Sequence, residues 1–276
     1  MTQPTEAPQG QPAIFVPQSD GSFLPTEFSR STWGADLVHG GPPAGLLARA
    51  IEREFLMDGW HPARLTVDLF RPVPRVPLSV VTRSVRSGRR IHAVEASIVV
   101  DGAEVTRATA VLLKEAEHPY ELPGEGGGAA RPGPRATAAA GPLGNPSSWP
   151  GFASTVEMAW TEGNMETRNG RRAGWMRVPL PLIADEETSP FVHAALLSDF
   201  GNALGNVSLG GGVGFINVDI TLYLARLPVG GWLHLASSAL PQPSGIGLVE
   251  TQLADEAGVF GRIVQATLAN PRSWEV

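Results

Sequence analysis

The chain contains no cysteine among its 276 residues. This absence excludes disulfide bonds, thiolate nucleophiles and cysteine-based zinc sites, and it fits a cytoplasmic location. Residues 1–12 carry no basic residue and no apolar core, so they are not expected to form a signal peptide. No run approaches the roughly 18 consecutive apolar residues of a membrane span, and none is expected.

Charged residues are also scarce, at 17% of the chain against 42% hydrophobic residues. The 21 basic and 27 acidic residues give a net charge of -6, which argues against nucleic acid as a partner, because phosphates are bound by clustered Lys and Arg. The six histidines show no spacing typical of a metal site. We therefore expect no metal and no cofactor.

The most informative feature that is present is an internal repeat. A helix followed by antiparallel strands is predicted twice, about 150 residues apart, which indicates two fused copies of one α+β unit. In the first copy, apolar spacing predicts a helix at 42–57 and strands at 62–71, 77–86, 89–101 and 104–115. In the second copy, it predicts strands at 154–162 and 172–178, a helix at 192–207, and strands at 213–225, 231–240, 246–254 and 259–269.

Composition divides the chain around a segment at 117–151 that is rich in Pro, Gly and Ala and is typical of a linker. We predict a flexible tail at 1–12, an N-terminal domain at 13–116, this linker, and a C-terminal domain at 152–276. The helix at 192–207 is apolar nearly all round, which is typical of a helix wrapped by other structure.

Asp199 is the only acidic residue of that apolar helix. A buried carboxylate is costly unless it is paired, and such groups concentrate at active sites. Gln265 interrupts an apolar strand in a similar way, and Asn217 precedes Asp219 on one strand face. Each of the three also has an ordinary structural explanation, so the pattern alone leaves their roles open.

A buried helix wrapped by an antiparallel sheet is the hotdog arrangement. The glycine pair Gly40-Gly41 before the first helix, the segment Phe70-Arg71-Pro72 and the second half of the chain resemble the acyl-CoA thioesterase II (TesB-like) family. The resemblance covers about residues 14–115 and 152–272. It implies a tandem (double) hotdog with two antiparallel sheets, each wrapping a long helix, and fatty acid metabolism as the setting.

The resemblance also implies a site and a reaction. Asp199, Asn217 and Gln265 align with the family's catalytic residues, although the family has Thr where this chain has Asn217. They would position a water that hydrolyses an acyl-CoA thioester. His39, Gly40 and Gly41 are the expected substrate-binding residues, and backbone N–H groups at Gly40-Gly41, or in the loop before Ser189, would bind the oxyanion.

Two alternatives remain open. One is a non-catalytic acyl-thioester binder, which the Asn217 departure leaves in play. The other is an acyl-thioester hydratase or dehydratase, which relies on an Asp–His pair, commonly about five residues apart. The position five after Asp199 is Leu204, so that pair is missing from the sequence. A homodimer or larger homo-oligomer is expected.

The repeat offers a test within the chain. Aligning Val67-Asp68 with Val218-Asp219 places Thr66 opposite Asn217, and aligning Arg107 with Arg262 places Ala110 opposite Gln265. The helix position opposite Asp199 is near Leu47 or Ala48, and neither is acidic, so the first copy lacks two of the three polar groups. Because buried polar groups cost stability unless they are satisfied or used, a single site in the second copy is predicted.

Overall fold

The computed structural model describes residues 12–117, 132, 135, 138–140, 151–207 and 214–270. The tail predicted at 1–12 and the linker predicted at 117–151 lie almost wholly outside these residues. Within the described ranges, no helix is both long and apolar enough to cross a membrane.

The first half of the chain follows the predicted order closely. A hairpin and a short 3-10 helix η1 come first, then the helix, then four long strands. The elements are β1 Phe15–Pro17, β2 Phe23–Pro25, η1 Glu27–Ser29, α1 Gly41–Phe55, β3 Trp60–Asp68, β4 Ser79–Ser87, β5 Ile91–Val100 and β6 Ala103–Lys114.

The second half repeats the helix and four-strand order after three extra strands and a short helix, with its first long strand interrupted between β10 and β11. Its elements are β7 Ala139–Ala140, α2 Phe152–Thr155, β8 Glu157–Glu162, β9 Arg171–Arg177, α3 Pro190–Ser198, α4 Phe200–Leu204, β10 Phe215–Asn217, β11 Asp219–Leu224, β12 Leu233–Pro241, β13 Ile246–Asp255 and β14 Gly258–Ala269. The predicted strands are therefore confirmed to within a few residues at most ends.

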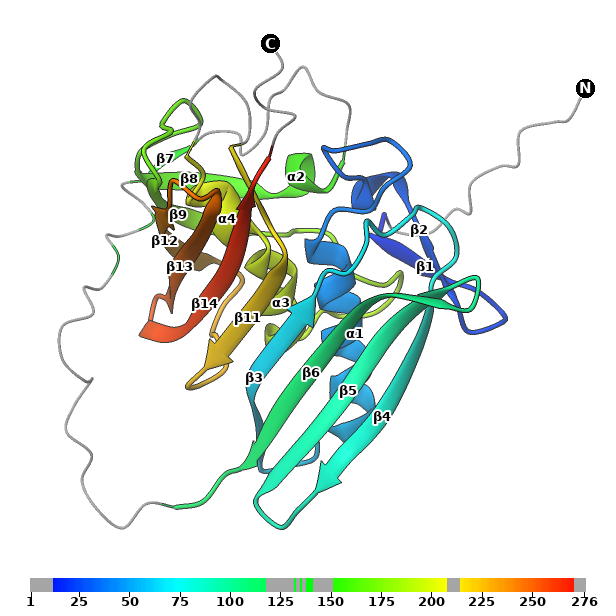
Figure 1. Cartoon of the computed structure of the whole chain (residues 1–276). Coiled ribbons are helices and arrows are strands. Elements are labelled where there is room, and N and C mark those ends of the chain that lie inside the picture. Colours follow the sequence, from blue (N-terminus) through cyan, green and yellow to red (C-terminus); the bar gives the residue numbers. More distant parts are fainter. Residues whose placement is uncertain are drawn as a thin grey trace, which may run out of the picture.

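The expectation of two separate sheets is wrong. Apart from the β1–β2 hairpin, the strands form one sheet of 12 strands in the order β4-β5-β6-β3-β11-β14-β13-β12-β9-β8-β7, with β10 beside β14 (Figure 1). The two copies join where β3 pairs antiparallel with β11, with Asp68 opposite Asp219 and Thr66 opposite Thr221. One hydrophobic cluster extends through both halves, so the copies share a sheet and a core.

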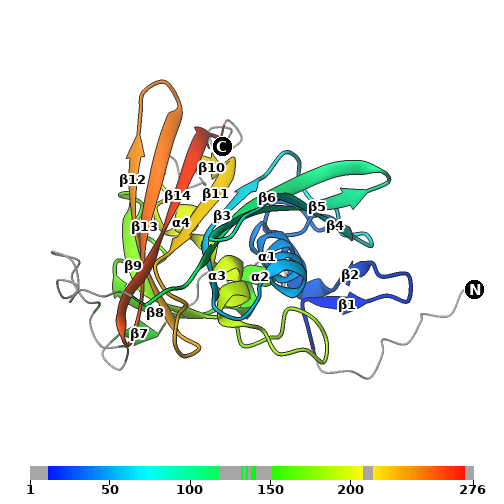
Figure 2. The ribbon, with the colours of Figure 1, turned by 90° about the horizontal axis from the view of Figure 1, so that it is seen from below.

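Figure 2 shows the sheet arching over the helices, with α1 and α3 side by side beneath it. The sequence explains both helix starts: prolines occupy the first turn of each, where backbone N–H groups have no helical partner. Ser189 caps α3 by accepting a hydrogen bond from the Val192 N–H at 3.2 Å. The buried face of α1 consists of small and aliphatic residues: Ala44, Leu46, Leu47, Ala48 and Ile51.

The single helix predicted at 192–207 is broken. The first part, α3, ends at Ser198, and the second, α4, starts at Phe200, so that Asp199 is the residue between them. This break was not predicted, because every residue around it is compatible with a helix.

The helices α1 and α3 run antiparallel in close contact. The start of α1 lies against the end of α3: a Cβ at Gly41 would collide with the Leu196 carbonyl, and a Cβ at Gly45 would lie 2.8 Å from the Leu196 side chain. At the opposite end, the Ser189 hydroxyl donates to Glu52 at 2.8 Å. Only residues without a side chain allow the start of α1 to approach so closely.

The strand register relates the copies position by position. Strand β3 bulges at Ala63, between Pro62 and Arg64, and the second copy is interrupted at Val218, between β10 and β11. These two irregularities match at the offset of 155 residues that also separates Thr66 from Thr221. The equivalent of Asn217 is therefore Pro62, and the alignment of Thr66 with Asn217 is wrong.

The contact between Gly41 and Leu196 can be tested by substitution. We expect Gly41→Ala to lower the free energy of unfolding by about 1–3 kcal/mol, because the new methyl group meets a backbone carbonyl that cannot rotate away. Urea unfolding measures the change. Gly231→Ala is the matched control, since a Cβ there meets nothing within 4 Å, and should change stability by no more than about 0.5 kcal/mol. Equal stability of the two variants would contradict this packing.

Candidate active site

Asp199 lies at the break between α3 and α4, and its side chain is only 10% exposed. Its Oδ2 is 3.1 Å from Nδ1 of His39, and its Oδ1 accepts a hydrogen bond from Nδ2 of Asn217 at 2.8 Å. His39 comes from the first copy, whereas Asp199 and Asn217 come from the second. The site is therefore assembled across the junction between the copies.

The surroundings of Asp199 favour its ionised form. Burial raises the pKa of its carboxyl, but hydrogen bonds from His39 and Asn217, the charge of His39 and the Gly41 N–H together outweigh burial. The net result is a pKa below the ordinary value of an aspartate. Such a carboxylate is a good partner for a cation and a weak acceptor of protons.

The loop before α1 brings His39, Gly40 and Gly41 to this carboxylate. The loop is held by hydrogen bonds from the His39 N–H to the Ser29 carbonyl at 2.9 Å and from the Val38 N–H to the Val73 carbonyl at 2.8 Å. Gly40 must remain glycine, because a Cβ would lie 2.6 Å from Oδ2 of Asp199. This close approach is the physical requirement behind the predicted glycine pair.

The His39 ring packs against two phenylalanine rings, with centroid distances of 5.2 Å to Phe152 and 5.1 Å to Phe200, and these two rings also stack on each other at 5.7 Å. Its side chain is 12% exposed. Phe152 opens α2 and Phe200 opens α4, so three separate segments fix the imidazole. The sequence analysis did not identify these aromatic contacts, and no local sequence signal connects residues so far apart along the chain.

Asn217 lies at the end of β10, where the strand is interrupted before β11. Its Oδ1 is 3.5 Å from Nδ2 of Asn202, which also donates to the Phe215 carbonyl at 3.1 Å. Asn202 was not predicted to contribute to the site. The two amides form a short chain of hydrogen bonds that leads from α4 to Asp199.

Gln265 is fully buried, and neither its Oε1 nor its Nε2 has a hydrogen-bond partner in the part of the chain that the structure describes. It lies beneath α4, where a Cβ at Gly201 would collide with its Oε1 and lie 2.8 Å from Oγ1 of Thr251. Gln265 is thus close to the helix that follows Asp199. No direct contact links Gln265 with Asp199 or Asn217 among the described residues.

The equivalent positions of the first copy are apolar. At the 155-residue offset, Asn217 corresponds to Pro62, Gln265 to Ala110 and the buried Thr267 to Leu112. The first copy therefore has an apolar residue at all three of these positions, including that of Asn217, where the sequence alignment had placed the polar Thr66.

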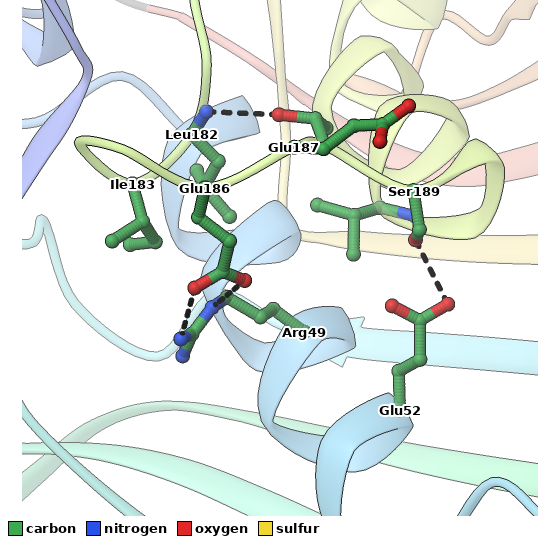
Figure 3. A pocket seen from close by; sticks show the side chains of 9 residues that line it. Arg49, Glu52, Leu182, Ile183, Glu186, Glu187 and Ser189 are labelled. Atoms are coloured by element: carbon green, nitrogen blue, oxygen red, sulfur yellow. Dashed lines mark hydrogen bonds and ion pairs between the residues drawn. The ribbon is translucent and has the colours of Figure 1, made fainter.

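At the opposite end of the α1–α3 pair, where Glu52 meets Ser189, charged side chains replace the buried acid and histidine (Figure 3). A small pocket of about 10 Å³ lies there, beside the Glu52–Ser189 hydrogen bond. Burial raises the pKa of Glu52. Arg49 forms a bidentate ion pair with Glu186 at 2.6 and 2.7 Å, which ties the loop before α3 to α1. This end has a stabilising ion pair and no histidine among its lining residues.

Three solved structures resemble the chain over nearly its whole length. A hot dog fold protein of unknown function from Alicyclobacillus acidocaldarius is 18% identical, with 91% of this chain and 92% of that chain covered and a TM-score of 0.69. The tesB protein of Mycobacterium avium subs paratuberculosis is 17% identical, with 91% and 93% of the two chains covered and a TM-score of 0.64. The acyl-CoA thioesterase II TesB2 of Mycobacterium marinum is 14% identical, with 93% and 94% covered and a TM-score of 0.61. At these identities the likeness establishes the hotdog fold.

Family models carry the assignment further. The acyl-CoA thioesterase N-terminal domain matches residues 29–113, and the acyl-CoA thioesterase C-terminal domain matches residues 130–269. The second match alone covers more than half of the chain, and the protein belongs to the acyl-CoA thioesterase family and is a thioesterase. No curated protein matches the sequence.

The environment of Asp199 predicts a specific pH dependence of stability. Folding lowers the pKa of Asp199, so ionisation of this carboxyl stabilises the folded state at pH values above the ordinary aspartate pKa of about 3.9. This contribution to the free energy of unfolding is lost as the pH falls through the pKa that Asp199 has in the folded protein. We expect the stability difference between the wild type and Asp199→Asn to shrink as the pH falls from about 6 to 3, measured by urea unfolding.

Asp219 supplies the opposite control. Its pKa is raised by burial and by the facing Asp68, although the Ala266 N–H, at 2.7 Å, works against this. The protonated carboxyl of Asp219 therefore contributes to the free energy of unfolding at low pH, and this contribution is lost as the pH rises through the pKa that Asp219 has in the folded protein. The difference between the wild type and Asp219→Asn should change in the opposite direction over the same range. Parallel curves for the two variants would show that the site is not built as described.

Proposed function

We propose that the chain hydrolyses acyl-CoA thioesters to a free acid and CoA, using a water held by Asp199, Asn217 and Gln265. The observation that carries the proposal is the buried Asp199 carboxylate, which meets Asn217 from the second copy and His39 from the first. Family membership supplies the substrate class.

The residues have distinct proposed roles. Asp199 and Asn217 form one side of the water site, and Asn217 replaces the hydroxyl of the family's Thr with an amide that can still donate and accept. Both amide atoms of Gln265 are buried and have no partner among the described residues, so they are available to hydrogen-bond a water or a substrate. Holding the water in an attacking geometry supplies much of the rate enhancement.

The N–H groups at the start of α1 are the proposed oxyanion site. Gly40 and Gly41 adjoin Asp199, and the N-terminus of α1 carries a partial positive charge that favours a developing negative oxygen. The loop before Ser189 is the weaker choice, since it lies at the opposite end of the helix pair, beside Glu52.

A second candidate function is hydration or dehydration of acyl thioesters. The sequence argued against it because no histidine lies five residues after Asp199. The structure brings His39 to Asp199 from the other copy, and this one observation keeps the alternative open. Ultraviolet absorbance of an enoyl thioester distinguishes the two reactions, because only dehydration creates the conjugated double bond.

The remaining expectations stay predictions. They are the domain division at 116 and 152, a cytoplasmic location, and a homodimer or larger homo-oligomer. A non-catalytic acyl-thioester binder would bind acyl-CoA without releasing a thiol.

Release of free CoA thiol from a panel of acyl-CoA substrates tests the proposal. We expect thiol release by the wild type and a fall in kcat/KM of about 10²–10⁴-fold in Asp199→Ala, because a positioned acid–base system contributes that much. Gln265→Ala should also lose activity. Glu250→Gln, a carboxylate on the outer face of β13 paired with Arg262, is the control and should retain full activity. Activity that survives Asp199→Ala and Gln265→Ala together would reject the site.

A further inference from the structure

The proton on His39 can be located from its neighbours. Nδ1 lies 3.1 Å from a carboxylate oxygen of Asp199 that can only accept hydrogen bonds. If Nδ1 carried no proton, two lone pairs would face each other at that distance in a poorly solvated site. The Gly41 N–H points at Nδ1, at 3.2 Å, and it hydrogen-bonds the Asp199 carboxylate as well. Because the ionised carboxylate is the stronger acceptor and has no proton to share, the Gly41 N–H serves the carboxylate and Nδ1 donates to Asp199.

The second ring nitrogen is then the free base. A neutral imidazole with a proton on Nδ1 has its lone pair on Nε2. Nε2 makes no hydrogen bond to any residue in the described ranges, and the ring retains partial exposure. By contrast, both oxygens of Asp199 are already occupied by His39 and Asn217.

We propose that His39 is the proton-transfer group of this site and that Asp199 is its positioning partner, the two acting as one dyad built from both copies. This inference rests on the proposed hydrolysis of thioesters and deepens it. It changes the predicted role of His39 from substrate binding to catalysis, and the role of Asp199 from holding the water to orienting the imidazole.

The reaction balances with one water and no further reagent. Nε2 takes a proton from the water as its oxygen bonds to the thioester carbon, and the carbonyl electron pair moves to oxygen. When that pair returns, the carbon–sulfur bond breaks, and Nε2–H gives its proton to the thiolate. The products are the acid and the free thiol, and His39 is neutral again.

The surroundings of His39 suit this cycle. Asp199 is the charged side chain in contact with the ring, and it stabilises the transient imidazolium. The other described neighbours are the rings of Phe152 and Phe200, whose faces also favour a cation and keep the imidazole in place. Gly41 contributes only its N–H.

Kinetics of His39→Gln test the dyad. We expect kcat to fall by about 10²–10⁴-fold with little change in KM. A residue that only binds substrate would raise KM and leave kcat in place, which would overturn the proposal. His92→Gln, which removes a ring stacked on Trp60, is the control.

The double variant shows whether the pair is one unit. If it is, His39→Gln with Asp199→Asn should lose little more activity than either single variant, because members of one catalytic unit are strongly non-additive. Multiplicative losses would mean that the two residues act separately and would overturn the dyad while leaving thioester hydrolysis intact.

Nitrogen NMR of labelled histidine gives a readout that is independent of activity. The wild type should show His39 as the Nδ1–H tautomer at neutral pH, and Asp199→Asn should shift the population towards Nε2–H. An Nε2–H tautomer in the wild type would overturn the proposal even if no substrate were found. Absence of thiol release together with the expected tautomer would instead reject the hydrolase function alone.

Discussion

The close contact between the start of α1 and the end of α3 is the constraint on which the site depends. Gly40 and Gly41 have no side chains, so the loop of the first copy can approach the Leu196 carbonyl and the Asp199 carboxylate of the second. The approach places His39 and a helix N-terminus beside a buried acid. A side chain at either glycine would separate the copies at this point and, with them, the two members of the polar pair.

The buried polar groups of the candidate site are confined to one of two equivalent places. The fold repeats its strand register and even its strand irregularity, so Pro62, Ala110 and Leu112 occupy the positions of Asn217, Gln265 and Thr267. An apolar core at those positions is the stable solution. Gln265, buried with neither amide atom hydrogen-bonded to a described residue, carries a cost of about 1–3 kcal/mol for an unsatisfied group. A fold tolerates such a cost where a site needs the group.

Periodicity predicted the elements of this fold but not how they meet. Alternating residues such as Val94, Ala96 and Ile98 identify a half-buried strand, because the pleat itself sets that period. The pairing of β3 with β11 depends on contacts between distant segments, so a single continuous sheet was not foreseen. The break at Asp199 has the same origin, since tertiary contacts with His39 and Asn217 override a sequence that is locally helical.

The site residues likewise divide into those that a local sequence pattern reveals and those that only contacts between distant segments reveal. Asp199 and Gln265 stand out in the sequence because a polar residue in an apolar run is costly, whereas a loop histidine is ordinary until the fold supplies its partner. Fusion of two copies in one chain lets the two ends of the helix pair diverge. At one end Arg49 and Glu186 tie α1 to the loop before α3, beside the bond between Glu52 and Ser189. Because that end supplies stability, the other end can hold a buried acid, a histidine and amide atoms without a hydrogen-bond partner among the described residues.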